Sequence, residues 1–307
     1  MLELNGPAFG TMQQRFGGDT FNTAVYLSRC ASDALQVWYA TALGDDPLSD
    51  ALLERWADEG LQLGLVRRIA GRLPGLYQIT VDTHGERRFS FWRDNSAARA
   101  YFDIDPTPLE QDWKQWDALY FSGISLAILP AAGRERLLAL AQALRQRGAR
   151  VVFDNNYRAS LWPDAQEARQ VFRRALAVAN LALITADDHQ ALFELPTAAA
   201  AVLAAQQLGC EEIVIKRGAE PTLVGCRGAD WDAVPTEKVA QVVDTTAAGD
   251  SFAAGYLSQR LGGASPRVAA QFGNHLAARV IAHHGAIIAR QDMVDLLLNK
   301  KLIAQTT

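Results

Sequence analysis

Residues 244–257 read DTTAAGDSFAAGYL and predict a loop that leads into a helix. A valine-rich run, 239–243, precedes this stretch and predicts a strand. Small residues at a helix start leave backbone N–H groups uncovered, and these groups together with the helix dipole favour an anion. Asp250 then suits a base that takes the proton of an attacking hydroxyl while the N–H groups hold a phosphoryl group.

A purely structural interpretation fits the same residues. Aspartate is common at helix N-termini, and small residues let a helix pack closely on a sheet. Because a short pattern occurs by chance, the residue types in 244–257 alone favour neither interpretation.

The composition indicates a folded α/β protein. The chain has 307 residues, of which 49% are hydrophobic, and this length suits one large domain or two smaller ones. A net charge of −4 argues against a general nucleic-acid binder. The three widely spaced cysteines form no metal or disulfide pattern, and no apolar run reaches membrane-spanning length, so we expect a soluble, cytoplasmic protein with no membrane partner.

The N-terminal third alternates helix and strand and then changes character. Hydrophobic periodicity predicts a helix over 20–29, a strand over 35–40 and a second helix over 47–59. Residues 73–93 instead alternate apolar and polar side chains around a turn at 83–86, which predicts an antiparallel hairpin. We expect this hairpin to form a small lid on an otherwise parallel fold.

From residue 117 onward, short apolar strands alternate with helices. The predicted strands are 118–122, 150–154, 181–185 and 213–216, and the predicted helices between them include 134–146 and 198–208. This rhythm is typical of a parallel sheet covered on both faces, which binds ligands at the carboxyl ends of its strands. Polar clusters stand at those ends, namely 154–158, 187–188, 216–218 and the loop at 244–250.

Two stretches of the chain resemble signatures of a known family. Residues 17–24 (GGDTFNTA) and 244–250 resemble the two signatures of the ribokinase-like (PfkB-type) carbohydrate kinases. The segments between them are most similar to the branch of this family that phosphorylates 2-keto-3-deoxygluconate. These segments are 72–77 (RLPGLY), 120–129 (YFSGISLAIL), 153–162 (FDNNYRASLW) and 214–219 (VIKRGA).

The resemblance implies a fold and a reaction. The fold is α/β, a Rossmann-like three-layer parallel sheet in a single domain over 1–307, with an antiparallel β lid built from about 1–17 and 73–94. The implied reaction uses ATP and Mg²⁺ to phosphorylate the C6 hydroxyl of the sugar acid. The implied partners are this small molecule and ATP, and a homo-oligomer formed through the lid is expected.

The resemblance also implies roles at the 244–250 loop. Asp250 is the base, and Ala247, Ala248 and Gly249 form the anion hole for the γ-phosphate. The family usually has glycine where this chain has Ala247. We expect that replacement to be harmless if the residue keeps a negative φ.

Six residues are implied to bind the sugar: Gly18, Asn22, Tyr77, Phe91, Arg93 and Arg158. Arg158 is the best candidate for the substrate carboxylate, because a guanidinium pairs with a carboxylate through two parallel bonds. Phe91 falls where relatives often have tyrosine. A solvated or dimer-facing strand is an alternative interpretation of Arg93 and Tyr77.

Lys216, Gly218 and Asn274 resemble nucleotide-side positions, and Asp188 resembles a residue that holds magnesium through water. The alternatives are a strand-end lysine in solvent, an ordinary surface asparagine and an acid at a helix N-terminus. A monovalent-cation site cannot be located in this sequence.

Relatives carry a further strand ahead of the segment that corresponds to Met1–Leu4. We therefore expect the true start codon to lie upstream of Met1; the alternative is that a form without this strand folds less stably.

Two other functions stay open. A kinase for a neutral sugar such as fructose or ribose would give the arginines no role, and a non-catalytic sugar-binding protein would not need Asp250. A nicotinamide dehydrogenase is disfavoured, because no Gly-x-Gly-x-x-Gly motif opens a βα unit.

Overall fold

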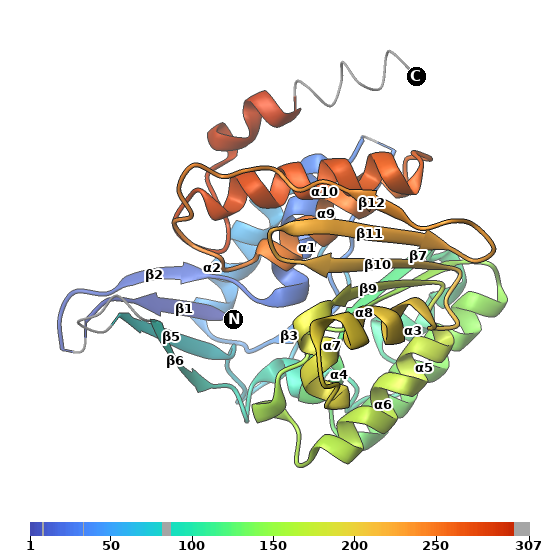
Figure 1. Ribbon diagram of the computed structural model, residues 1–307. Coiled ribbons are helices and arrows are strands. Elements are labelled where there is room, and N and C mark those ends of the chain that lie inside the picture. Colours follow the sequence, from blue (N-terminus) through green and yellow to red (C-terminus); the bar gives the residue numbers. More distant parts are fainter. Residues whose placement is uncertain (8, 33, 82–86, 298–307) are drawn as a thin grey trace.

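The computed structural model describes residues 1–297 except 8, 33 and 82–86. Its centre is a six-stranded sheet in the order β12-β11-β10-β9-β8-β7, in which β7 to β10 are parallel and β11 and β12 are antiparallel (Figure 1). The strands are β7 Ala118–Ser122, β8 Arg150–Asp154, β9 Leu181–Thr185, β10 Glu212–Arg217, β11 Glu220–Cys226 and β12 Asp232–Val234. The first three strands begin and end where the sequence predicts them.

Helices cover both faces of this sheet because its strands are apolar on both sides. Val151 and Phe153 of β8 pack into a cluster with α5 and α6, whereas Val152 packs on the opposite face with α9 and α10. The Rossmann-like three-layer prediction is therefore confirmed. The helices are α1 Asp19–Cys30, α2 Pro47–Asp58, α3 Pro108–Gln111, α4 Gly123–Ile128, α5 Ala131–Gln146, α6 Ala165–Val178, α7 Ala186–Phe193, α8 Ala198–Gln206, α9 Ala248–Arg260 and α10 Pro266–Ile281.

A second sheet of four strands projects from the side of this core (Figure 1). Its order is β2-β1-β5-β6, and the predicted hairpin of β5 and β6 is confirmed, although its turn at 83–86 lies outside the described residues. β1 pairs with β5 in parallel, so the lid sheet is mixed and the prediction of an antiparallel lid is wrong for this pair. The strands are β1 Leu2–Asn5, β2 Gln13–Phe16, β5 Leu76–Val81 and β6 Arg87–Trp92.

Two predicted strands are absent. Residues 35–40 form only an isolated bridge between Trp38 and Gln62, and the strand begins afterwards as β3, Thr41–Leu43. The valine-rich run before Asp244 forms no strand, since the N–H groups of Val243 and Asp244 donate to the Ile281 carbonyl at the end of α10. An apolar composition therefore does not by itself make a strand in either segment, and it does not ensure burial, since Trp38 is 39% and Val242 54% exposed.

A two-stranded parallel sheet of β3 and β4, Val66–Arg68, stands apart from the central sheet. Within the described ranges, β3 has β4 as its only strand partner and β7 has only β8. Residues of both β3 and β7 line one large cavity of ≈ 1990 Å³, which also reaches the loop before α9. The described residues do not test the expectation of a further strand ahead of Met1. No helix in the described part of the chain has the length and apolarity to cross a membrane.

Candidate active site

The loop before α9 has an unusual backbone. Ala247 caps the helix with φ 61 and ψ 16, in the left-handed region. The expectation that alanine is harmless here through a negative φ is therefore wrong, because a Cβ in this conformation costs about 1 kcal/mol relative to glycine. The loop keeps this turn because Asp244 anchors it, accepting hydrogen bonds from the N–H groups of Thr246 at 2.9 Å and Gly285 at 2.8 Å.

The turn leaves donors available at the start of α9. Ala248 N–H donates to the Thr245 carbonyl at 3.2 Å, whereas the N–H groups of Gly249 and Asp250 have no protein acceptor among the described residues. These two groups lie in the first turn, where a helix provides no internal acceptor. The loop therefore has the geometry of an anion site, as predicted from its small residues.

Two residues of α1 hold Asp250. Asn22 Nδ2 donates to Asp250 Oδ2 at 2.8 Å, and Thr23 Oγ1 donates to the Asp250 carbonyl at 3.3 Å. Asn22 is 4% exposed, and its Oδ1 accepts the Gly18 N–H at 3.3 Å. Residues 17–24 and 244–250 thus meet in space, and Asn22 contacts the Asp250 carboxylate directly. A contact of Asn22 or Gly18 with a sugar stays a prediction.

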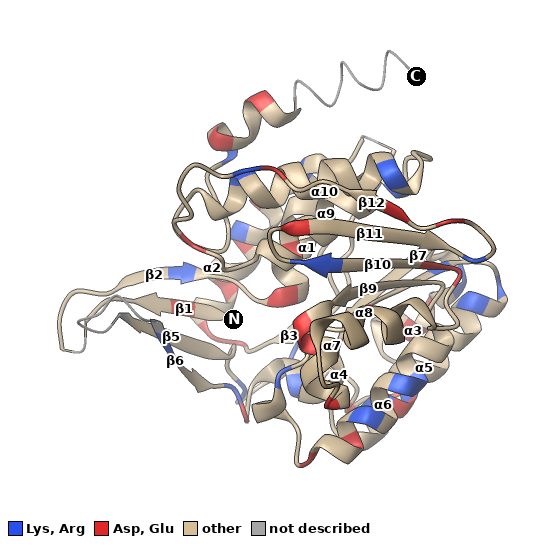
Figure 2. Cartoon of the chain, viewed as in Figure 1, with Lys and Arg blue, Asp and Glu red and all other residues tan. Residues whose placement is uncertain are grey.

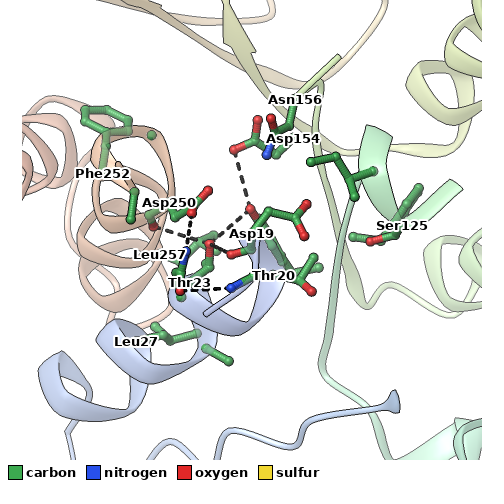
Figure 3. A pocket seen from close by; sticks show the side chains of 18 of the residues that line it. Asp19, Thr20, Thr23, Leu27, Ser125, Asp154, Asn156, Asp250, Phe252 and Leu257 are labelled. Carbon is green, nitrogen blue, oxygen red and sulfur yellow. Dashed lines mark hydrogen bonds between the residues drawn. The ribbon is translucent and has the colours of Figure 1, made fainter. Parts of the chain in front are cut away.

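Three carboxylates share this end of the cavity. Figure 3 shows Asp19, Asp154 and Asp250, from α1, β8 and α9, lying around one pocket. Burial, with the charges of Asp19 and Asp154, raises the pKa of Asp250 to about 8, against the opposing effects of Asn22 and Lys216. A carboxylate with its pKa near neutrality is suited to accept a proton in this pH range.

Lys216, one of the three residues predicted to lie on the nucleotide side, stands beside this loop, with its Nζ 3.5 Å from a Cβ built at Gly249. Its Nζ lies 3.1 and 2.9 Å from the two carboxylate oxygens of Asp154, and the residue is only 9% exposed, so the alternative of a lysine in solvent is wrong. Gly218 adopts φ +62 with no atom within 4 Å of an added Cβ. A side chain there would extend into open space that belongs to the same cavity.

Asn274 is not the surface residue that the alternative interpretation expected. It is 6% exposed, its Oδ1 accepts from Thr222 Oγ1 at 2.8 Å, and its Nδ2 donates to the carbonyls of Val234 and Pro235. The Asn274 amide therefore fastens α10 to the end of β12. Its place near an adenine stays a prediction, and a contact through the same amide would compete with these bonds.

The lid contributes an aromatic wall to the same cavity. Tyr77 is 5% exposed and donates to the Glu3 carboxylate, so a solvated strand is wrong for this residue. Phe91 lies next to Tyr77 with ring centroids 6.0 Å apart, and the Arg93 guanidinium lies 4.2 Å from the Phe91 ring centre. The structure thus brings the three predicted lid residues together on one side of the cavity.

Arg158 and Asp188 form an ion pair. Arg158 Nη1 lies 3.1 Å from each Asp188 oxygen, and the Arg158 side chain is 49% exposed at the cavity. Burial raises the pKa of Asp188, and Arg158 acts against this shift. The sequence assigned one residue to the sugar and the other to the metal, whereas in the structure each is the other's partner.

The carboxylates suit a magnesium ion that arrives with phosphate ligands. No group of three or more His, Cys, Asp or Glu side chains in the described ranges is placed to hold a metal alone. Magnesium commonly binds proteins through one or two carboxylates together with water and phosphate oxygens. Asp188 fits such a role through water.

The sequence reasoning missed several residues of the site. Asp19, Asp154 and Tyr120 all line the cavity, and Tyr120 Oη lies 3.4 Å from Asp154 Oδ2. Their signal was present, because Asp19 follows the Gly17-Gly18 turn and Asp154 ends a predicted strand. Only the folded chain shows that these side chains converge on Asp250.

Comparison with known proteins agrees with this geometry. The family model described as "pfkB family carbohydrate kinase" matches residues 3–293. The 2-dehydro-3-deoxygluconokinase of Dickeya dadantii is 45% identical over 298 residues, covering 95% of this chain and 96% of that protein. The enzyme of the same name from Escherichia coli strain K12 is 42% identical, covering 95% and 96%.

A solved structure has the same architecture. Aminoimidazole riboside kinase from Salmonella enterica, in complex with aminoimidazole riboside and an ATP analogue, superposes with a TM-score of 0.82 at 25% identity. The match covers 96% of each chain. Because the family model matches nearly its whole length, this chain belongs to the pfkB family of carbohydrate kinases.

Proposed function

We propose that the protein is a 2-keto-3-deoxygluconate kinase. It transfers the γ-phosphoryl group of ATP to the C6 hydroxyl of 2-keto-3-deoxy-D-gluconate and releases 2-keto-3-deoxy-6-phosphogluconate. The observation that best supports this substrate is that two guanidinium groups, those of Arg93 and Arg158, line the same cavity as Asp250. An anionic sugar needs such cations, and relatives that share 41–45% of their residues with this chain have the matching name.

The chemistry follows from the placement of these groups. The sugar binds between the lid and the core, with its carboxylate toward Arg158 and Arg93 and its C6 hydroxyl toward Asp250. Asp250 accepts the hydroxyl proton while the C6 oxygen bonds to phosphorus. The N–H groups of Gly249 and Asp250 stabilise the charge on the transferring group.

ATP and Mg²⁺ are the proposed cosubstrate and metal. Lys216, Gly218 and Asn274 line the cavity and are the proposed nucleotide contacts. Asp188 would hold the ion through water. When bound, magnesium neutralises phosphate charge.

The lid has two proposed roles. Closed over the sugar, its aromatic wall excludes water and limits ATP hydrolysis, so ATPase activity without sugar should be far below the kinase rate. Equal rates would contradict this role. Phe89 and Phe91 of β6 line the cavity, whereas Trp92 lies on the opposite face of the strand and is 58% exposed, and we propose that this opposite face pairs with the lid of a second copy. A monomer in sedimentation at micromolar concentration would contradict that pairing. A cytoplasmic location stays a prediction.

The substrate is tested by Arg158→Ala, assayed by coupled ADP release with 2-keto-3-deoxygluconate, fructose and ribose. Loss of a charge-assisted contact of about 1.5–3 kcal/mol should raise KM for the sugar acid about 10- to 100-fold. Arg174→Ala is the matched control, because Arg174 pairs with Glu135 on the surface. An unchanged KM in Arg158→Ala, with turnover of a neutral sugar, would favour the neutral-sugar kinase.

A further inference from the structure

Lys216 and Asp154 form an ion pair that is buried more deeply than a lysine needs to be in order to contact a nucleotide. The Lys216 side chain is 10% exposed and that of Asp154 is 2% exposed. They extend from the carboxyl ends of β10 and β8, on either side of β9. Removing both charges from water is costly, so such a pair demands well-formed bonds, and here both carboxylate oxygens accept from one ammonium.

Asp154 is itself held in place from a third element. Tyr120 of β7 donates its hydroxyl to Asp154 Oδ2 at 3.4 Å and lies 3.2 Å from Thr23 Oγ1. Thr23 in turn donates to the backbone carbonyl of Asp250. The carboxylate of Asp154 is therefore linked to the backbone of Asp250 through Tyr120 of β7 and Thr23 of α1.

The ammonium of Lys216 lies beside the anion hole. A Cβ added to Gly249 would stand 3.5 Å from Lys216 Nζ. An ammonium has three N–H donors, and Asp154 accepts two bonds, which leaves one donor for a ligand. Lys216 also acts on the charge of Asp250, whose pKa it lowers. Figure 2 shows the end of β10 in blue, where Lys216 and Arg217 stand in the sequence.

We propose that Lys216 contacts the transferring phosphoryl group as a catalytic cation, and that Asp154 is the positioning residue that holds it there. This inference rests on the proposed function. In the step, the bond from phosphorus to the ADP oxygen breaks and the bond to the C6 oxygen forms. The hydroxyl proton passes to Asp250, the negative charge left on ADP stays there, and Lys216 keeps its proton throughout.

The test uses Lys216→Met, Asp154→Asn and the double variant, with kcat, sugar KM and ADP affinity measured on each. Loss of one donor to a developing charge typically costs about 10²–10³ in kcat, so we expect this loss in Lys216→Met with sugar KM and ADP affinity nearly unchanged. Asp154→Asn should lower kcat by about 10-fold, and it should add little to Lys216→Met because the two act as one unit.

Glu212→Gln is the matched control. It removes a buried negative charge from the same strand, where Glu212 pairs with Arg260 at the other end of α9. The variant therefore reports the effect of losing a buried ion pair away from the loop. Its kcat should match the unmodified protein even if its Tm falls. Lys216→Arg, which keeps the charge, should recover part of the rate and serves if Lys216→Met does not fold.

Three results would overturn the inference: a kcat within twofold of normal in Lys216→Met, a loss confined to ADP affinity, or additive effects in the double variant. Failure of the proposed function is separate, because the unmodified protein would then release no ADP with the sugar acid. The same variants are in that case assayed with whichever sugar of the panel is turned over.

Discussion

Asn22 and Asp250, 228 residues apart in the chain, share a 2.8 Å hydrogen bond from the Asn22 amide to the Asp250 carboxylate. This bond joins the N-terminal signature to the C-terminal one. The Asp250 carboxylate is buried and lies near the like charges of Asp19 and Asp154, and the bond from Asn22 stabilises its ionised form. Burial and the like charges raise the pKa of Asp250, whereas the Asn22 bond and Lys216 lower it. Substitutions can separate these effects.

Replacing the base should remove turnover and increase stability. Asp250→Asn should lower kcat by about 10²–10⁴-fold, as expected for a lost general base, with ADP affinity retained. The folded-state pKa of Asp250 is raised to about 8, so the folded protein binds more protons than the unfolded chain from about pH 4 to pH 8. Stability from this group therefore falls as pH rises through that window. Thermal unfolding should show a higher Tm for the variant, with a larger gain at pH 8 than at pH 5. Near-normal kcat would remove the base assignment.

The same pKa predicts the pH dependence of the rate. Because Asp250 must be ionised to accept a proton, kcat/KM should rise with pH toward a plateau above about pH 8. Asn22→Leu removes the bond that lowers this pKa and should shift the rise to higher pH. Thr23→Val is the control, since the Thr23 hydroxyl contacts the backbone carbonyl of Asp250 and not its carboxylate, so the midpoint should be unchanged. A shared midpoint in all three proteins would contradict the role of Asn22.

Backbone strain at the anion hole is testable through Ala247→Gly. Alanine at φ 61 costs about 1–2 kcal/mol relative to an unstrained residue, whereas glycine adds about 0.5–1 kcal/mol of unfolded-state entropy. The net change should be a stabilisation of up to about 1 kcal/mol, measured by urea unfolding. Ala248→Gly, in the helix itself, should instead destabilise the protein. A loss of stability in Ala247→Gly would show that the left-handed turn is not strained.

The Met1 ammonium carries a separate cost. It donates to the Gly17 carbonyl at 2.9 Å, and burial lowers its pKa to about 6, against the opposing charge of Asp19. Between pH 6 and pH 8 the unfolded chain binds more protons at this amine, so its contribution to stability rises with pH. Extending the chain ahead of Met1 converts the ammonium to an uncharged peptide N–H, which should raise Tm more at pH 6 than at pH 8.

Local patterns in the sequence determined much of this protein. The bounds of β7, β8 and β9, the hairpin of the lid and the small-residue loop ending at Asp250 follow from periodicity and residue size, which act over a few neighbours. Residues 35–40 and the valine-rich run show the limit of such patterns, because a strand also needs a neighbouring backbone to pair with, and the N–H groups of Val243 and Asp244 donate to Ile281 in α10 instead.

Tertiary structure decided which of the candidate groups meet. It brought Asn22 into hydrogen-bond contact with Asp250 and formed the ion pair of Arg158 and Asp188. It also formed the ion pair of Lys216 and Asp154 beside Gly249. It also forced Ala247 to a positive φ. These contacts depend on how strand ends and helix starts align at one edge of the sheet. No local pattern encodes that alignment, since it arises from packing between segments up to 228 residues apart.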